Sequence, residues 1–368
     1  MADVVESIIG AAYFCGGVSL GNECVKYFGL GLEWKPISTR IDQILARSDD
    51  LATSADTFTV QVEDVEHMLD YTFHRKSLLI EALTHASYQG SNNQMPSYER
   101  MECLGDSVLD LIVNSYLYRV PGKKYSPGHV YFRKITVVNM HFLAYICLNT
   151  STTKAATMPM RNVETGKIEE SHEEHEISLF KCLLHSSVPV LEDQAGVYSR
   201  YKRMKNEIGH ALREGDTYPW AALTRLQAPK FFSDMIESLI GAVYIDSRGD
   251  MGTVEGVLRN LGIMQVLEHL VQDDVDVMHP ISRLTFWMQK TGQKLDFKLE
   301  QKEREVVCRV FVGDEELECA RATAVFRGKV SQEEVKFSAA EAAIKELKLR
   351  DVGVRYDVLK QRKTKGKE

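Results

Sequence analysis

The sequence predicts a mainly α-helical protein that ends in a small α+β domain. Residues 62–150 and 228–250 carry apolar side chains at helical spacing, as in the stretch YERMECLGDSVLDLIVNSYLY at residues 98–118. From about residue 276 the pattern changes to a short helix, three alternating segments and a closing helix, an α-β-β-β-α order. With 368 residues, 44% of them apolar, the chain is long enough for two domains.

Charge and cysteine content narrow the class of protein. The net charge of -7 argues weakly against nonspecific binding of nucleic acid, although a total hides local patches. Seven cysteines without a C-x-x-C pair indicate reduced thiols, so we expect a cytoplasmic or nuclear location. The N-terminus lacks the basic start of a secretory signal, and no apolar run reaches membrane-spanning length, so we expect no membrane partner.

The chain contains a partial internal repeat. ADVVESIIGAAYFCGG at residues 2–17 matches SDMIESLIGAVYIDSRG at residues 233–249, so Asp3 aligns with Asp234 and Glu6 with Glu237. The first copy reads as a buried helix that enters a Gly-Gly turn. The sequence therefore predicts one whole module preceded by the tail of another.

Five segments follow from these patterns. They are a remnant at residues 1–30, an irregular polar linker at 31–61, a complete helical domain at 62–268, the α-β-β-β-α domain at 276–350 and a basic tail at 351–368. Residues 151–225 read as an insertion in the helical domain. Its first part is acidic and has no apolar period, so we expect it to be mobile.

Four carboxylates carry the chemical signal. Glu102 and Asp106 lie four residues apart, and Asp234 and Glu237 lie three apart, so each pair shares one helix face. If the two helices pack together, the four side chains converge and their charges repel. Mg²⁺ or Mn²⁺ would offset that repulsion, because hard divalent cations prefer oxygen ligands.

Two glycines stand beside these acids. Gly105 and Gly241 would permit close approach of the two helices. A divalent cation in such a site suits phosphodiester hydrolysis, since a metal lowers the pKa of its bound water. The alternative is a pair of amphipathic helices whose acidic edges face solvent.

At these residues the sequence resembles the ribonuclease III family, which cleaves double-stranded RNA. ERMECLGDSVLDL at 99–111 is similar to the family signature, and YTFHRKSLLIEALTHASY at 71–88 and SDMIESLIGAVYIDS at 233–247 resemble its flanking motifs in the same order. The resemblance covers residues 62–268 apart from the insertion and implies an all-helical endonuclease domain. The metal-binding and catalytic residues that it implies are Glu102, Asp106, Asp234 and Glu237, with Glu99 as a supporting acid.

The partial repeat resembles the C-terminal end of Dicer-like proteins, which carry two ribonuclease III domains in tandem. The acidic insertion, APK at 228–230 and SPG at 126–128 are similar to fungal Dicer-like proteins of the second type. The first domain lacks its partner acids here, so the chain reads as a fragment or as a nuclease that uses its second domain alone. Lys230 would support the site by contacting the scissile phosphate; the alternative is a solvated lysine at a helix start.

Residues 276–350 resemble a double-stranded-RNA-binding domain. The resemblance implies phosphate contacts from basic residues near the last helix, and the candidates are Arg327, Lys329 and Lys336. Glu333 and Glu334 stand where the family favours lysines, and carboxylates repel phosphates. The alternative for this domain is therefore a packing or protein-contact role.

The resemblance implies a Mg²⁺- or Mn²⁺-dependent endoribonuclease that cleaves double-stranded RNA in small-RNA production, RNA silencing and antiviral defence. One such domain cuts one strand, so a homodimer through the ribonuclease III domain would cut both. The rival hypothesis is a catalytically silent fragment that binds RNA or partner proteins. An intact set of four acids favours the nuclease.

Overall fold

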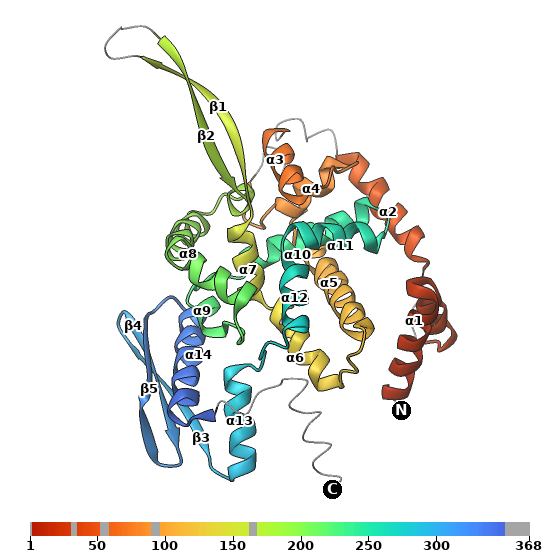
Figure 1. The fold of residues 1–368 in the computed structure, drawn as a ribbon. Helices are drawn as coiled ribbons and strands as arrows, with labels where there is room; N and C mark the ends of the chain where they lie inside the picture. The colour runs from red at the N-terminus through yellow and green to blue at the C-terminus, as the bar shows by residue number, and fades with distance from the viewer. Residues whose placement is uncertain (1, 31–34, 52–58, 90–95, 162–167, 350–368) are drawn as a thin grey trace.

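The computed structural model describes residues 2–30, 35–51, 59–89, 96–161 and 168–349, and it confirms a mainly helical chain that ends in a small antiparallel sheet (Figure 1). The first helices are α1 (Ala2–Tyr27), α2 (Ile37–Leu51), α3 (Thr59–Leu69), α4 (Lys76–Leu83), α5 (Glu99–Arg119), α6 (Pro127–Val138) and α7 (Met140–Asn149). The middle of the chain forms β1 (Ser151–Arg161), β2 (Ile168–Ser178), the 3₁₀ turn η2 (Leu179–Cys182), α8 (Val188–Glu214) and α9 (Trp220–Thr224). The remaining elements are α10 (Phe231–Asp246), α11 (Met251–Asn260), α12 (Ile263–Gln272), α13 (Pro280–Thr291), β3 (Leu295–Lys302), β4 (Glu305–Val312), β5 (Glu315–Val325) and α14 (Lys329–Glu346).

Helix α10 is the centre of the large helical body. Every residue of this helix is buried, and it packs against α4, α5 and α7 (Figure 1). The sequence FFSDMIESLIGAVYID is apolar around most of the helix, as expected for a helix enclosed on all sides. Two of the predicted site acids, Asp234 and Glu237, therefore lie on a fully enclosed helix.

Polar contacts hold α10 at its end and its middle. The Asp246 carboxylate accepts hydrogen bonds from the backbone N–H of His74 at 2.8 Å, the backbone N–H of Arg75 at 2.9 Å and the Tyr71 hydroxyl at 2.7 Å. The Ser238 hydroxyl donates to the carbonyl of Ala82 at 2.7 Å. These bonds satisfy buried polar groups and join α10 to the segment around α4.

The insertion departs from the helical architecture of the domain around it: β1 and β2 form an antiparallel hairpin that extends away from the helices (Figure 1). The first part of the insertion, which has no apolar period, lies in this hairpin, whose residue pairs run from Ser151–Ser178 to Arg161–Ile168. Near the base of the hairpin, Lys154 of β1 pairs with His175 of β2, and both side chains are exposed to solvent. The strand sequences STTKAATMPMR and IEESHEEHEIS show no regular alternation of apolar and polar residues, so the sequence pattern could not reveal the hairpin. Residues 162–167 lie outside the described residues.

The segment predicted as an irregular linker contains a packed helix. In α2, Ile41 and Leu45 are buried at 3% and 2% exposure, and α2 contacts α4 and α10. Two apolar residues four apart in a polar segment are a weak signal, but they suffice to attach one face of a helix. Residues 31–34 and 52–58 of this segment lie outside the described residues.

Helix α1 was expected to be buried, and that is wrong: Gly21 is its one buried residue. The helix lies at the side of the molecule, where Phe14 stacks on Tyr118 of α5 at 4.0 Å between ring centroids and the Tyr13 hydroxyl lies 2.8 Å from the Ser115 hydroxyl (Figure 1). The Gly-Gly turn is present as a kink at Gly16 and Gly17. With a mean hydropathy of 1.5, α1 is the one described helix long and apolar enough, by length and composition, to cross a membrane.

The C-terminal region shows the predicted order α13-β3-β4-β5-α14, with an antiparallel sheet in the strand order β3-β4-β5. Helix α14 packs on β4 and β5 with one side and on α9 with another (Figure 1). Phe337 of α14 lies 6.3 Å from Trp220 and 4.5 Å from His279, measured between ring centroids. The small domain is thus docked on the helical body through α14. The basic tail from residue 350 lies outside the described residues.

Candidate functional site

The site forms where α5 crosses α10. A Cβ atom on Gly105 would lie 1.7 Å from the carbonyl oxygen of Glu237, and one on Gly241 would lie 2.2 Å from that of Met101. Real side chains cannot approach backbone this closely, so both positions require glycine. The predicted close approach of the two helices is present, and it places the acidic residues of α5 above those of α10.

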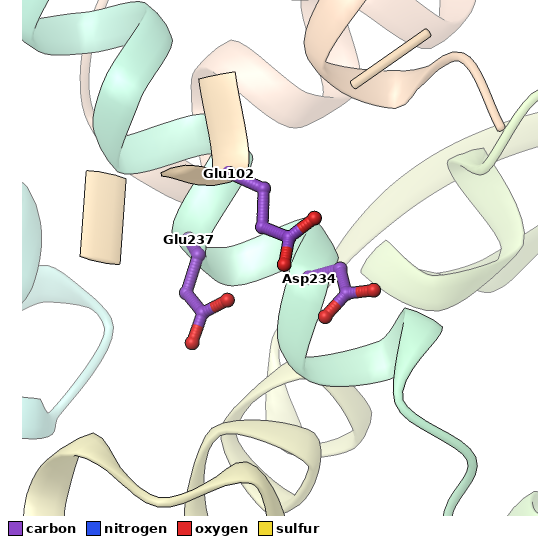
Figure 2. Close-up of side chains that lie close together, drawn as sticks. All are labelled: Glu102, Asp234 and Glu237. Atoms are coloured by element: carbon purple, nitrogen blue, oxygen red, sulfur yellow. The ribbon is translucent and has the colours of Figure 1, made fainter. Parts of the chain in front are cut away.

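Three of the four predicted acids converge at this crossing. Glu102 from α5 and Asp234 and Glu237 from α10 each offer an oxygen atom, and these atoms lie within 4.8 Å of one another (Figure 2). Asp234 is 5% exposed and Glu237 is 9% exposed, whereas Glu102 lies at the surface end of the group. Within the described ranges this is the one set of His, Cys, Asp or Glu side chains close enough to hold a metal ion.

Burial and mutual repulsion disfavour the charged form of these carboxyl groups. Burial, with the charges of Asp234 and Asp106, raises the pKa of Glu237 to about 8. Burial also raises the pKa of Asp234, against the opposing effect of Lys230. An added positive charge would lower both pKa values and offset the desolvation of the carboxylates. The donor set, made only of carboxylate oxygens, fits a hard divalent cation.

Lys230 supplies a positive charge at this place. Its ammonium donates to Asp234 Oδ1 at 2.6 Å and also bonds to Glu102. Burial lowers the pKa of Lys230, but the bonds to Asp234 and Glu102 outweigh it, and the net pKa is raised. The ammonium thus bridges two of the three clustered acids. The phosphate contact predicted for Lys230 stays a prediction.

The other predicted site residues lie at the rim. Asp106 is exposed and is not part of the three-residue group, although its charge raises the pKa of Glu237. Burial and the charge of Asp110 raise the pKa of Asp106 itself. Glu99 is also exposed and outside the group. The catalytic and supporting roles of these acids stay predictions.

Two further residues shape the site and were missed in the sequence. The buried Tyr98 hydroxyl donates to Asp234 Oδ2 at 3.2 Å, which orients the carboxylate. Arg100 Nη2 donates to Glu81 Oε2 at 2.7 Å and attaches the start of α5 to α4. A signal existed for Tyr98, because a tyrosine buried beside an acidic helix needs a hydrogen-bond acceptor.

The predicted RNA-contacting residues differ in their exposure to solvent. Arg327 and Lys329 are exposed before and at the start of α14, and Lys336 is partly buried in the helix. Glu333 and Glu334 were expected to face phosphates, but both face the helical body. Glu333 lies 3.3 Å from His141 Nε2, and Glu334 accepts a hydrogen bond from Gln227. These contacts favour the packing role for this part of α14.

The chain is similar to known proteins of one family. Residues 99–248 match the model of the ribonuclease III domain. Dicer-like protein 2 of Coccidioides immitis (strain RS) is 33% identical over 356 residues, which are 95% of this chain and 24% of that protein. Dicer-like protein 2 of Neurospora crassa is 33% identical over 299 residues, 76% of this chain and 19% of that protein. The chain thus spans about a quarter or less of the length of these relatives.

Among solved structures, the chain is similar to the nuclease domain of ribonuclease III from Campylobacter jejuni. The sequence identity is 24% and the TM-score 0.32, with 54% of this chain and 95% of that chain covered. A TM-score this low adds nothing to the assignment of the chain to a family. The ribonuclease III match at residues 99–248 includes both helices of the crossing, α5 and α10, and the four predicted acids that they carry. Residues 99–248 therefore form a ribonuclease III domain, and this part of the chain is a ribonuclease III-type endonuclease domain.

Proposed function

We propose that this chain cleaves double-stranded RNA with a divalent cation, Mg²⁺ or Mn²⁺, held by Glu102, Asp234 and Glu237. The observation that carries the proposal is the convergence of these three carboxylates within 4.8 Å on two helices whose backbones are in close contact. When bound, the cation supplies an activated water and charge stabilisation for phosphodiester hydrolysis. Asp106, at the rim of the same face, completes the proposed set of acids.

The remaining residues position this set. Tyr98 fixes one oxygen of Asp234, and the Gly105–Glu237 contact fixes the spacing of the helices. Lys230 holds Glu102 and Asp234 together while no cation is bound, and its exposed side chain can turn towards a phosphate. We assign Glu99 the role of an outer acid that adds negative potential near the site.

The substrate class rests on the similarity to Dicer-like proteins and on the ribonuclease III domain. Small-RNA production, RNA silencing and antiviral defence are the processes in which we expect this cleavage to serve. A single domain has one cluster and would cut one strand, so we propose that two copies pair to cut both.

The test is cleavage of a labelled RNA duplex by purified chain with Mg²⁺. We expect Asp234→Asn and Glu237→Gln to abolish cleavage, because each removes a charged ligand while keeping its shape. Asp110→Asn is the matched control: it lies in the same acidic row on α5, but it pairs with Lys134 at 2.7 Å and should keep most activity. Full activity in either cluster variant, or none in the wild-type chain, would contradict the proposal and favour the silent fragment.

A further inference from the structure

A cleft lined by arginines lies between the helical body and the C-terminal domain. Its volume is about 490 Å³, within the range of about 300–1,000 Å³ that ligand sites occupy. We call it the arginine cleft. Its charged lining consists of Arg200 and Arg203 from α8, Arg225 after α9, Arg327 before α14, and Glu334.

Two of these guanidinium groups meet above a glycine. A Cβ atom on Gly196 of α8 would lie 3.6 Å from Arg200 Nη1 and 3.8 Å from Arg327 Nη1. The two arginines come from different domains, so docking of α14 creates this meeting of like charges. Burial and the charge of Arg327 lower the pKa of Arg200. The place above Gly196 therefore favours an anion.

Arg200 is held by uncharged partners, and one of the four arginines, Arg225, forms an ion pair. Arg200 donates from Nε to the carbonyl of Leu226 at 2.8 Å and from Nη2 to that of Gln227 at 3.3 Å, and both acceptors are uncharged. Arg225 pairs with Glu207 at 2.9 Å. In the described part of the chain, Arg203 and Arg327 form no ion pair.

Two carboxylates face this group and offset part of its charge. Glu334 lines the cleft and binds Gln227, and Asp193 of α8 lies near Arg200 and Arg327. Burial raises the pKa of both carboxyl groups, against the effect of the arginines. Because Arg225 is paired with Glu207, the remaining arginines of the lining, Arg200, Arg203 and Arg327, face Glu334 and Asp193. Three positive groups against two carboxylates leave an excess of one positive charge.

We propose that the arginine cleft binds a phosphate group and that the group it takes is a backbone phosphate of the RNA substrate. Guanidinium groups match phosphate geometry and form charge-assisted hydrogen bonds with it. The choice of RNA rests on the proposed function and on the position of the cleft along the chain. Gln227 in the cleft is three residues before Lys230 at the acidic cluster, so their Cα atoms lie at most about 11 Å apart.

The first test is binding of a labelled RNA duplex to the full chain, measured by fluorescence anisotropy in EDTA, which separates binding from cleavage. We expect the double variant Arg203→Gln/Arg327→Gln to weaken binding about tenfold or more at low salt and to reduce the salt slope by about 2, one for each lost phosphate contact. The matched control Arg40→Gln/Arg321→Gln removes two exposed charges elsewhere and should retain the wild-type slope.

The second test adds a side chain at Gly196, inside the arginine cleft. Gly196→Asp places a carboxylate beside Arg200 and Arg327, whereas Gly196→Ala makes the same backbone change without charge. Both residues suit a helix better than glycine, so both variants should fold. We expect Gly196→Asp to weaken RNA binding about tenfold and Gly196→Ala to leave it unchanged. Equal binding by these two variants overturns RNA as the ligand.

A third measurement identifies the source of the phosphate. Pyrophosphate should raise the thermal midpoint of Gly196→Ala and not that of Gly196→Asp, which supports a phosphate site of either origin. If pyrophosphate distinguishes the variants but RNA does not, the ligand is a free phosphate compound and the RNA assignment falls. If neither probe distinguishes them, the cleft is not a phosphate site. A chain that binds RNA through the cleft and cleaves nothing would overturn the proposed function alone.

Discussion

At the scale of single residues, the site depends on how two glycines and one lysine act on three acids. Gly105 and Gly241 let the helices approach until a Cβ would meet backbone at 1.7 Å and 2.2 Å. That approach brings Glu102 to Asp234 and Glu237, and repulsion among them requires a positive charge. Lys230 meets this need within the chain by bridging Glu102 and Asp234.

Lys230 and a metal ion should compete for the same oxygens. In EDTA we expect Lys230→Met to lower the free energy of unfolding by about 1 kcal/mol, a modest value because the lysine side chain is 61% exposed. The variant should also gain more thermal stability from Mg²⁺ than the wild type does, since binding to the folded state raises stability. Thermal scans with and without Mg²⁺ measure both effects. The same Mg²⁺-dependent shift in both proteins would show that the lysine does not share the cation site.

At the scale of elements, α14 is the connection between the two domains. Phe337, Glu333 and Glu334 all face the helical body, so the helix end that would be expected to meet RNA is used for docking. His279, which directly precedes α13, completes this contact between Phe337 at 4.5 Å and Trp220 at 5.0 Å.

Acid should weaken this contact. Burial and the neighbouring His141 lower the pKa of His279 from its ordinary value of 6.5 to about 4. The folded chain therefore binds fewer protons than the unfolded chain between these pH values, and stability is lost as the pH falls through this window. We expect a loss of about 2 kcal/mol, and we expect His279→Phe to remove it. Urea unfolding at pH 7 and pH 5 measures the difference, with His210→Phe on the exposed side of α8 as the control. An unchanged pH dependence in His279→Phe would assign the acid sensitivity to another group.

The contacts that join the β1–β2 hairpin to the body among the described side chains lie at its base. There the Thr152 hydroxyl lies 2.9 Å from His67 Nδ1, and Lys154 pairs with Asp64 at 2.6 Å. Replacing residues 155–174 by an Asn-Gly turn should keep these contacts and change stability by no more than about 0.5 kcal/mol. Calorimetry of the shortened chain checks this. A thermal midpoint lowered by more than about 5 °C would mean that the outer hairpin packs on the body.

At the scale of the whole molecule, α1 lies against one end of α5, the helix along which the proposed pairing of two copies would place the second chain. Leu104 and Leu111 on α5 are only partly buried, while Val108 is in the core at 5% exposure. Phe14 and Tyr13 of α1 contact Tyr118 and Ser115 at the other end of α5. Pairing of two domains along α5 would compete with this contact.

Removal of α1 should strengthen pairing. We expect a chain that begins at residue 35 to show a larger dimer fraction at micromolar concentration than the full chain, because the covered end of α5 becomes available. Sedimentation velocity of both proteins measures the fractions, and Phe14→Ala in the full chain tests the same contact with a single change. A smaller dimer fraction after removal of α1 would mean that α1 itself contributes to the interface.

The sequence by itself determined the helical module and the α-β-β-β-α order, because both follow from the periodicity of neighbouring residues in the chain. Gly105 and Gly241 indicated that two helices could approach closely, but that α5 does pack on α10 is a result of the tertiary structure. The repeat was also visible in the sequence, but its copies have different environments: every residue of α10 is buried, whereas α1 has one buried residue, Gly21.

Only the tertiary structure decided which side chains meet across elements. It left Asp106 at the rim, placed Lys230 between Glu102 and Asp234, and turned Glu333 and Glu334 towards the helical body. It also brought Arg327 to Arg200 above Gly196. These contacts join residues far apart in the sequence, and they depend on the orientation of packed helices, which no local pattern records.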